Sequence, residues 1–436
     1  MIMNTIAERP RYSCSLGGAI TTAASVYRVV PVLHAGPGCG MQLFNGIGYV
    51  AGFQAPAYIG SSALPSSNTR ERDVVFGGED RLRNLLRSAQ EVMDADLYLV
   101  LTGCTAALIG DDVESIIEEF RTQGVSIAHA STPGFKGTTY HGYDIVWKAF
   151  LDQVVKPPRR RYARLVNIFG IVPGQDAYWQ GTLEEIERLL KGLGLEVNTF
   201  HTHRQGIKSI HRASEAALNI VLSPWLAQET VDTFQKTFGI PYLRFAGVPV
   251  GPTDTEAFLW KVATALEIPQ RSAKQSIDRE IRWIYDQFEK ASLAFTGFDF
   301  RHRFAVLGDS GTTIGILRFL ANDFGQIPVL AVINEDPPEK IRENIREELS
   351  KLEFVQTPEI LFTTDPWQAH EKLREIHPSF VLGSSLDKSI AQEIGALHAS
   401  VSFPITDRLI LSRTYSGIRG SAYLIEDFFA PALTAL

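Results

Sequence analysis

Short apolar runs alternate with amphipathic stretches along nearly the whole chain. The runs are rich in Val, Ile and Leu, and continuous apolar runs of this length are typical of strands buried on both faces of a parallel sheet. They lie at residues 29–33, 97–104, 125–130, 165–171, 195–200, 216–222, 242–245, 304–307, 328–333, 360–363 and 380–383. Stretches between them, such as 79–93 and 113–123, space apolar residues three or four apart and predict amphipathic helices.

This strand–helix alternation forms three successive units, and each unit opens with a strand that is followed by glycine. It predicts an α/β fold of three Rossmann-like domains, whose parallel sheets are flanked by helices. We place the domains at residues 1–160, 161–300 and 301–436, with a basic, proline-containing linker at 156–161 marking the first boundary. Ligands of such folds bind at the carboxyl ends of the strands, so a site is expected there.

The chain has 436 residues, with 49 acidic and 42 basic side chains, giving a net charge of −7. This balance argues against nucleic acid as a partner, because phosphate binding needs a basic face. No apolar run reaches the length of a membrane span, and the first residues lack the apolar core of a signal peptide. We therefore expect no membrane partner and a cytoplasmic location.

The chain contains three cysteines, Cys14, Cys39 and Cys104, and an odd, low number is unsuited to a disulfide framework. Cys14 precedes a small-residue helical stretch, Cys39 lies in a glycine-rich loop after the strand at 29–33, and Cys104 closes the strand at 97–104. Buried thiols often serve only as small apolar side chains. Their position beside glycines at strand ends favours a second interpretation, in which the three converge on a bound group.

The spacing of the cysteines bears on which group they could hold. Zinc sites use close pairs of cysteines, and this chain has none. Widely separated thiols suit a larger iron–sulfur cluster, and three ligands are one short of a simple four-cysteine cluster. The remaining ligands would then come from another subunit.

Other motifs carry less information. The run 308–311 after a strand is not a dinucleotide-binding G-x-G-x-x-G, and no phosphate-binding P-loop occurs. His201 and His203 have the spacing of a metal-binding pair but lack an evident third ligand. His34 is expected to satisfy backbone groups, and Asp111 and Asp112 are expected to cap the following helix.

Several segments together resemble the component 1 family of nitrogenases and nitrogenase-like reductases. The resemblance covers nearly the whole chain, and its C-terminal part is similar to the beta-type subunits. Its motifs are His34–Cys39 (HAGPGC), 76–78 (FGG), 102–105 (TGCT), 109–112 (IGDD), 131–135 (STPGF), Gly137, 142–144 (GYD), 403–408 (FPITDR), 415–417 (YSG) and Gly420.

The resemblance implies three Rossmann-like domains and an α₂β₂ heterotetramer with an alpha-type catalytic subunit. It further implies an 8Fe P-cluster-type iron–sulfur cluster shared between the subunits, with Cys14, Cys39 and Cys104 as this chain's ligands. Thr138 stands where a hydroxyl can ligate the oxidised cluster. The cluster would relay electrons from a transient, ATP-dependent iron–sulfur reductase protein to a catalytic iron–sulfur cofactor in the partner subunit. No catalytic residue is expected in this chain, because its middle part lacks a fourth cysteine.

Within the family, the chain lacks the N-terminal extension of the molybdenum enzyme's beta subunit, which disfavours that enzyme. It has three cysteines, whereas the beta-type subunits of tetrapyrrole reductases and of maturation scaffolds tend to have fewer, which disfavours both. We expect the beta-type subunit of a methylthio-alkane reductase, an oxidoreductase that cleaves C–S bonds. The alternatives are the beta subunit of an alternative nitrogenase that reduces dinitrogen, and a cofactor-maturation scaffold.

Overall fold

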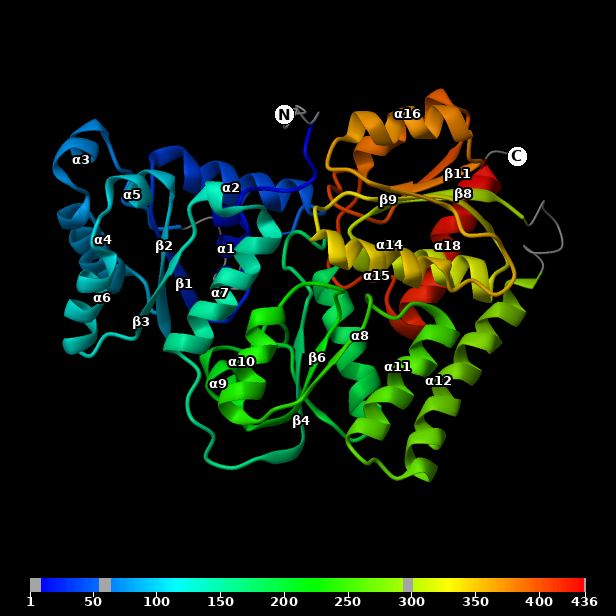
Figure 1. The fold of residues 1–436 in the computed structure, drawn as a ribbon, viewed down its shortest axis with the longest axis horizontal. Helices are drawn as coiled ribbons and strands as arrows, with labels where there is room; N and C mark the ends of the chain where they lie inside the picture. The colour runs from blue at the N-terminus through cyan, green and yellow to red at the C-terminus, as the bar shows by residue number, and fades with distance from the viewer. Residues whose placement is uncertain (1–8, 55–63, 293–300, 435–436) are drawn as a thin grey trace.

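The computed structural model of the chain describes residues 9–54, 64–292 and 301–434. Within these residues the main strands form three sheets, and every strand pair in them is parallel. Helices flank each sheet; in Figure 1 the N-terminal unit lies at the left, the middle unit at the lower centre and right, and the C-terminal unit at the upper right. The predicted α/β class and its three parallel sheets are confirmed.

The N-terminal sheet has the order β1-β2-β3, and β1 and β2 are buried at every residue, as their apolar runs predict. Its strands are β1 (Val29–His34), β2 (Leu97–Thr102) and β3 (Ile127–Ser131). Its helices are α1 (Ser15–Ala24), α2 (Pro37–Val50), α3 (Glu71–Phe76), α4 (Glu79–Val92), α5 (Cys104–Ile109), α6 (Val113–Thr122), the 3₁₀ turn η1 (Gly134–Lys136) and α7 (Thr139–Gln153).

The middle sheet has the order β5-β4-β6-β7, so the chain starts in the centre of the sheet and extends it on both sides. Its strands are β4 (Tyr162–Phe169), β5 (Glu196–Asn198), β6 (Ala216–Val221) and β7 (Tyr242–Arg244). Its helical elements are α8 (Trp179–Gly192), α9 (Ile207–His211), η2 (Ala213–Glu215), α10 (Gln228–Phe238), α11 (Gly251–Ala265) and α12 (Gln270–Lys290).

The C-terminal sheet has the order β10-β9-β8-β11-β12. Its strands are β8 (Arg303–Gly308), β9 (Ile327–Ile333), β10 (Glu359–Phe362), β11 (Phe380–Gly383) and β12 (Leu397–Ser400). Its helical elements are α14 (Ser310–Arg318), the π-turn η3 (Phe319–Asp323), α15 (Glu339–Ser350), α16 (Pro366–Ile376), η4 (Ser385–Asp387), α17 (Lys388–Glu393) and α18 (Gly417–Thr434). Among the described helices, none combines the length and the apolar character needed to cross a membrane.

The units share apolar packing. Trp147 of α7 lies edge-on to Phe169 of β4, with ring centroids 4.9 Å apart, and to Phe200, at 4.6 Å. One continuous core therefore joins the N-terminal and middle sheets. The domain limits at 160/161 and 300/301 stay predictions.

Two local predictions need correction. The Ser-, Pro- and Gly-rich composition of residues 54–80 predicts a loop, but this stretch contains α3; its residues 55–63 lie outside the described part of the chain. The strand expected over 97–104 ends at Thr102, because Gly103 already adopts the extended cap conformation that starts α5.

Candidate functional site

All three cysteines lie at the beginnings of helices. Cys14 is the N-cap of α1, Cys39 is the third residue of α2, and Cys104 is the first residue of α5. The expected loop at Cys39 and strand end at Cys104 are thus wrong: Pro37 starts α2, because its fixed φ suits a first helical position, and Gly103 caps α5. Unpaired amides and the helix dipole at these ends favour anionic sulfur.

The structure brings Cys14 and Cys104 together at Gly134 of η1, and Cys39 lies near enough to both for their thiols to influence its own. The Gly134 amide donates a hydrogen bond to the Cys104 Sγ at 3.0 Å. A Cβ at Gly134 would lie 3.2 Å from the Cys104 Sγ and 3.3 Å from the Cys14 Sγ, so a side chain there would crowd both sulfurs. Burial raises the pKa of Cys39, and the neighbouring thiols of Cys14 and Cys104 raise it further. All three cysteines are half-buried.

The backbone of Thr138 pairs with the backbone of Cys14. The two residues form an antiparallel bridge, and Thr138 is the N-cap of α7. Its hydroxyl oxygen is 3.2 Å from His141 Nδ1, one turn into the helix. The structure therefore places Thr138 next to the cysteine group, with its hydroxyl engaged by His141.

Close packing of α1 on α7 fixes this neighbourhood. A Cβ at Gly18 would lie 2.0 Å from the Thr139 carbonyl oxygen, and one at Gly142 would lie 2.0 Å from the Ser15 carbonyl oxygen. Only glycine allows the two backbones to approach so closely. The small residues predicted to pack α1 tightly thus hold the start of α1, with Cys14, against the start of α7.

A buried histidine–aspartate pair supports the same edge of the sheet. His34, the last residue of β1, has its Nε2 2.8 Å from the Asp111 Oδ2 and its Nδ1 3.1 Å from the Ser67 Oγ. Burial lowers the pKa of His34, with Asp111 acting in the opposite direction. The expected backbone role of His34 and cap role of Asp111 are wrong, whereas Asp112 does cap α6, accepting from the Ser115 amide.

Exposed apolar side chains are present on several elements of the N-terminal unit. They come from the elements that carry the site or adjoin it, and Figure 1 shows α2, α3 and α5 together at one end of the N-terminal sheet. They are Tyr49, Phe53, Val74, Val75, Phe76, Leu108 and Phe135. Phe76 is 80% exposed and Leu108 75%. Exposed apolar side chains on neighbouring elements are typical of an interaction surface.

The cysteines do not form a site for one metal ion. Within residues 9–54, 64–292 and 301–434, no group of three or more His, Cys, Asp or Glu side chains could hold a single ion. His201 and His203 are also separate: the His201 Nδ1 is 2.8 Å from the Ser25 Oγ, and the half-exposed His203 contacts Glu187.

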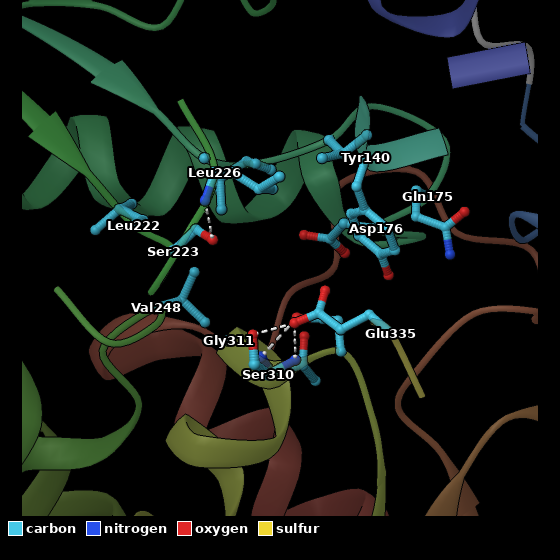
Figure 2. A pocket seen from close by; sticks show the side chains of 15 residues that line it. Tyr140, Gln175, Asp176, Leu222, Ser223, Leu226, Val248, Ser310, Gly311 and Glu335 are labelled. Atoms are coloured by element: carbon cyan, nitrogen blue, oxygen red, sulfur yellow. Dashed lines mark hydrogen bonds between the residues drawn. The ribbon is translucent and has the colours of Figure 1, made fainter. Parts of the chain in front are cut away.

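A second concave site, which the sequence did not indicate, lies between the middle and C-terminal sheets (Figure 2). It is a cavity of about 30 Å³ at the carboxyl ends of β4, β6, β8 and β9, and a water molecule needs about 10–15 Å³ of such space. Asp176, Asp309 and Glu335 line it, and no described lining residue is Lys or Arg. Burial raises the pKa of both Asp176 and Glu335 to about 7, and the charge of Asp309 adds to each effect.

Hydrogen bonds and ring contacts together link this cavity to the cysteine side of the molecule. The Glu335 Oε1 accepts from the Ser310 amide at 3.0 Å and from the Trp225 Nε1 at 3.1 Å. The Trp225 ring packs on Tyr140 and His141 of α7, with centroids 5.8 and 5.7 Å apart. His141, which contacts Thr138, thus connects the two sites.

Comparison with known proteins agrees with this architecture. The family model described as nitrogenase component 1 type oxidoreductase matches residues 14–432. The nitrogenase molybdenum-iron protein beta chain of Bradyrhizobium diazoefficiens is 24% identical over 434 residues, spanning 92% of this chain and 79% of that one. The beta chain of the same name from Methanothermobacter thermautotrophicus is 24% identical over 451 residues, spanning 97% and 93%. A solved structure described as nitrogenase Cp1 at pH 6.5 shares the fold, with a TM-score of 0.82 and 19% identity over 100% of this chain and 95% of that one.

Proposed function

The chain belongs to the nitrogenase component 1 type oxidoreductases, and from this premise we propose that it is the electron-relaying beta-type subunit of a nitrogenase-like reductase complex. One observation carries the proposal: Cys14, Cys39 and Cys104 are far apart in the sequence but close in the fold, with Cys14 and Cys104 meeting at Gly134 and Cys39 near both. An iron–sulfur cluster bound there would be shared with the partner subunit.

The residues present fit such a cluster. Thiolates are the ligands that iron–sulfur clusters use, and hydrogen bonds to sulfur tune their potentials. Gly134 leaves room beside two of the sulfurs and donates its amide to the Cys104 Sγ. The three cysteines lie at helix beginnings, where the helix dipole favours negative charge on the sulfurs. The bound cluster would supply reversible electron transfer, and the chain would hold it and exclude side chains from its surface.

The exposed apolar side chains support an alpha-type partner that covers this face, in an α₂β₂ assembly. Burying an apolar side chain such as Phe76 contributes roughly 1.5–3 kcal/mol, so several of them provide a substantial driving force for association. The catalytic cofactor would reside in that partner, and an ATP-dependent reductase would deliver the electrons. Thr138 would be a hydroxyl ligand only after it leaves His141.

Iron analysis of the co-purified complex tests the proposal. Cys104→Ala should lower iron per complex and change the EPR signal of the reduced and oxidised samples. The control is Ser272→Ala, an exposed serine near the start of α12, which should leave both unchanged. Unchanged iron content and EPR in the Cys104 variant would refute the cluster. A complex that holds iron but transfers a cofactor without turnover would instead be a maturation scaffold.

For the substrate we propose methylthio-alkanes, whose C–S bond would be reduced, with dinitrogen as the alternative. An identity of 24% to nitrogenase beta chains is compatible with a change of substrate. The complex, its reductase and ATP should be assayed side by side with dinitrogen, acetylene and dimethyl sulfide. Methane from dimethyl sulfide without ammonia from dinitrogen supports the thioether reaction, and ammonia without methane overturns it.

A further inference from the structure

The segment that leads into Cys14 is anchored by the far end of the chain. Arg11 lies three residues before Cys14, and its guanidinium is almost fully buried. The Arg11 Nη1 and Nη2 each donate to one oxygen of Asp387, both at 2.7 Å, and Nη1 also donates to the Ser384 Oγ. Two parallel charge-assisted bonds of this kind fix both the position and the orientation of the guanidinium.

The Asp387 end of this pair is itself held rigidly. Its carboxylate accepts from the Ser384 amide at 2.8 Å, and its Oδ1 lies 2.9 Å from the His370 Nε2. Asp387 is fully buried at the end of η4, directly after β11 of the C-terminal sheet. The anchor therefore belongs to the core of the C-terminal unit and not to a mobile surface loop.

The arm between Arg11 and α1 is fastened at several further points. The Gln175 Nε2, from the middle unit, donates to the Arg11 carbonyl oxygen at 2.8 Å. The Ser13 amide donates to the Thr139 Oγ1 at 2.8 Å, and the Thr139 amide donates to the Ser13 carbonyl oxygen at 2.9 Å. Cys14 is thus held from both sides: by α7 within its own unit, and by Arg11 through the other two.

We propose that Arg11 and Asp387 are positioning residues for Cys14, through which the C-terminal unit fixes one sulfur of the cysteine group. This inference rests on the proposed function, in which Cys14 is a ligand of the cluster. Cys39 and Cys104 lie on α2 and α5, which follow β1 and β2 directly, so their positions come from the N-terminal sheet. Loss of the Arg11–Asp387 pair should therefore release Cys14 selectively.

Thiol reactivity in the full, metal-free, reduced chain tests this selectivity. A short pulse of iodoacetamide followed by peptide mass spectrometry gives a separate alkylation rate for each cysteine. In Arg11→Ala and in Asp387→Asn we expect Cys14 to react at least about tenfold faster, because the arm opens locally more often, while Cys39 and Cys104 keep their rates. The control Arg188→Ala removes a partly buried arginine paired with Glu185 and Glu280, away from the arm, and should leave all three rates unchanged.

Two results would overturn the proposal. One is a Cys14 rate equal to wild type in both variants. The other is equal acceleration of all three cysteines, including the case in which far-UV circular dichroism shows an unfolded variant. The milder Asp387→Asn change keeps the shape of the side chain. Because the chain carries no metal in this experiment, its outcome is independent of the iron analysis that tests the proposed function.

Discussion

Two buried acidic groups at strand ends of the C-terminal sheet behave in opposite ways. Burial alone would raise the pKa of Asp387, yet the charge of Arg11 and hydrogen bonds from His370, Arg11 and Ser384 hold it far below its usual range. Glu335 has no arginine or lysine beside it among the described lining residues of its cavity, and burial raises its pKa to about 7. Both carboxyls are buried. The presence or absence of a cationic neighbour therefore decides whether the folded protein favours the charged or the protonated carboxyl.

The two groups therefore give stability opposite dependences on pH. The folded pKa of Asp387 is depressed, so its contribution is present above its unfolded pKa and is lost as the pH falls through the folded value. The folded pKa of Glu335 is raised, so its contribution is complete below its unfolded pKa and is lost as the pH rises through about 7. Near neutral pH the Arg11–Asp387 pair makes its full contribution to stability, while the Glu335 carboxyl in the cavity begins to lose its proton.

The largest expected effect comes from breaking the paired site. Arg11→Ala leaves the Asp387 carboxylate buried without its cation, and removing one partner of a buried pair costs about 3–5 kcal/mol. Urea unfolding at neutral pH measures this loss. The surface pair control Arg374→Ala, whose partners are exposed glutamates, should change the free energy of unfolding little. If Arg11→Ala lowered the free energy of unfolding no more than the control does, the Arg11–Asp387 pair would not stabilise the protein as proposed.

The next effect concerns the unpaired site. Glu335→Gln replaces the titrating carboxyl by a neutral amide. The loss of unfolding free energy between about pH 5 and about pH 8 should therefore become smaller by up to about 3 kcal/mol. The loss that remains should come from Asp176, whose pKa is also about 7. Urea unfolding across this range gives the slope. Glu343→Gln on the exposed face of α15 is the matched control and should keep the wild-type slope. An unchanged slope in Glu335→Gln would show that the cavity is already ionised at low pH.

The smallest effect is that of a single donor. Trp225→Phe keeps a ring beside Tyr140 but removes the Nε1 donor to Glu335, which should cost about 1 kcal/mol while Glu335 is protonated. The cost should grow above about pH 7, because hydrogen bonds to charged acceptors are stronger. Unfolding at an acidic and an alkaline pH measures both values. Trp283→Phe, at a partly exposed tryptophan of α12, should show no such growth, and equal behaviour of the two variants would contradict the assignment.

The fold followed from the sequence because its signals are local. Buried parallel strands appear as unbroken apolar runs, and those of β1, β4, β8 and β9 were predicted within a few residues. Strand β12 was missed because its four residues, LHAS, mix polar and apolar types. The glycine-rich turn at Cys39 indicates a helix after it, and this helix begins earlier than expected, at Pro37. The helix beginning at Cys104 was missed, although Gly103 stands at its N-cap.

The nearness of the cysteines could be predicted because each lies beside glycine or a turn, although they prove to be at helix beginnings and not at strand ends. The groups that support it could not. Asp111 was interpreted as a helix cap because its sequence neighbours suffice for that role, whereas its actual partner, His34, is 77 residues away. Glu335 directly follows a strand and could have been recognised as a strand-end polar group. Arg11 offered no such signal, because nothing near it in the sequence reveals a buried carboxylate.

The link between Arg11 and Asp387 also has a consequence for biosynthesis. The two residues are 376 positions apart, and a ribosome adding about 5–20 residues per second needs roughly 20–75 s to travel that distance. Throughout this interval the N-terminal unit can form its sheet and its cysteine helices, and the arm before Cys14 can bond Thr139, but it lacks the Asp387 anchor. The last contact that positions the third sulfur forms only when translation is almost complete, so the cysteine group reaches its full set of supporting contacts late in the synthesis of the chain.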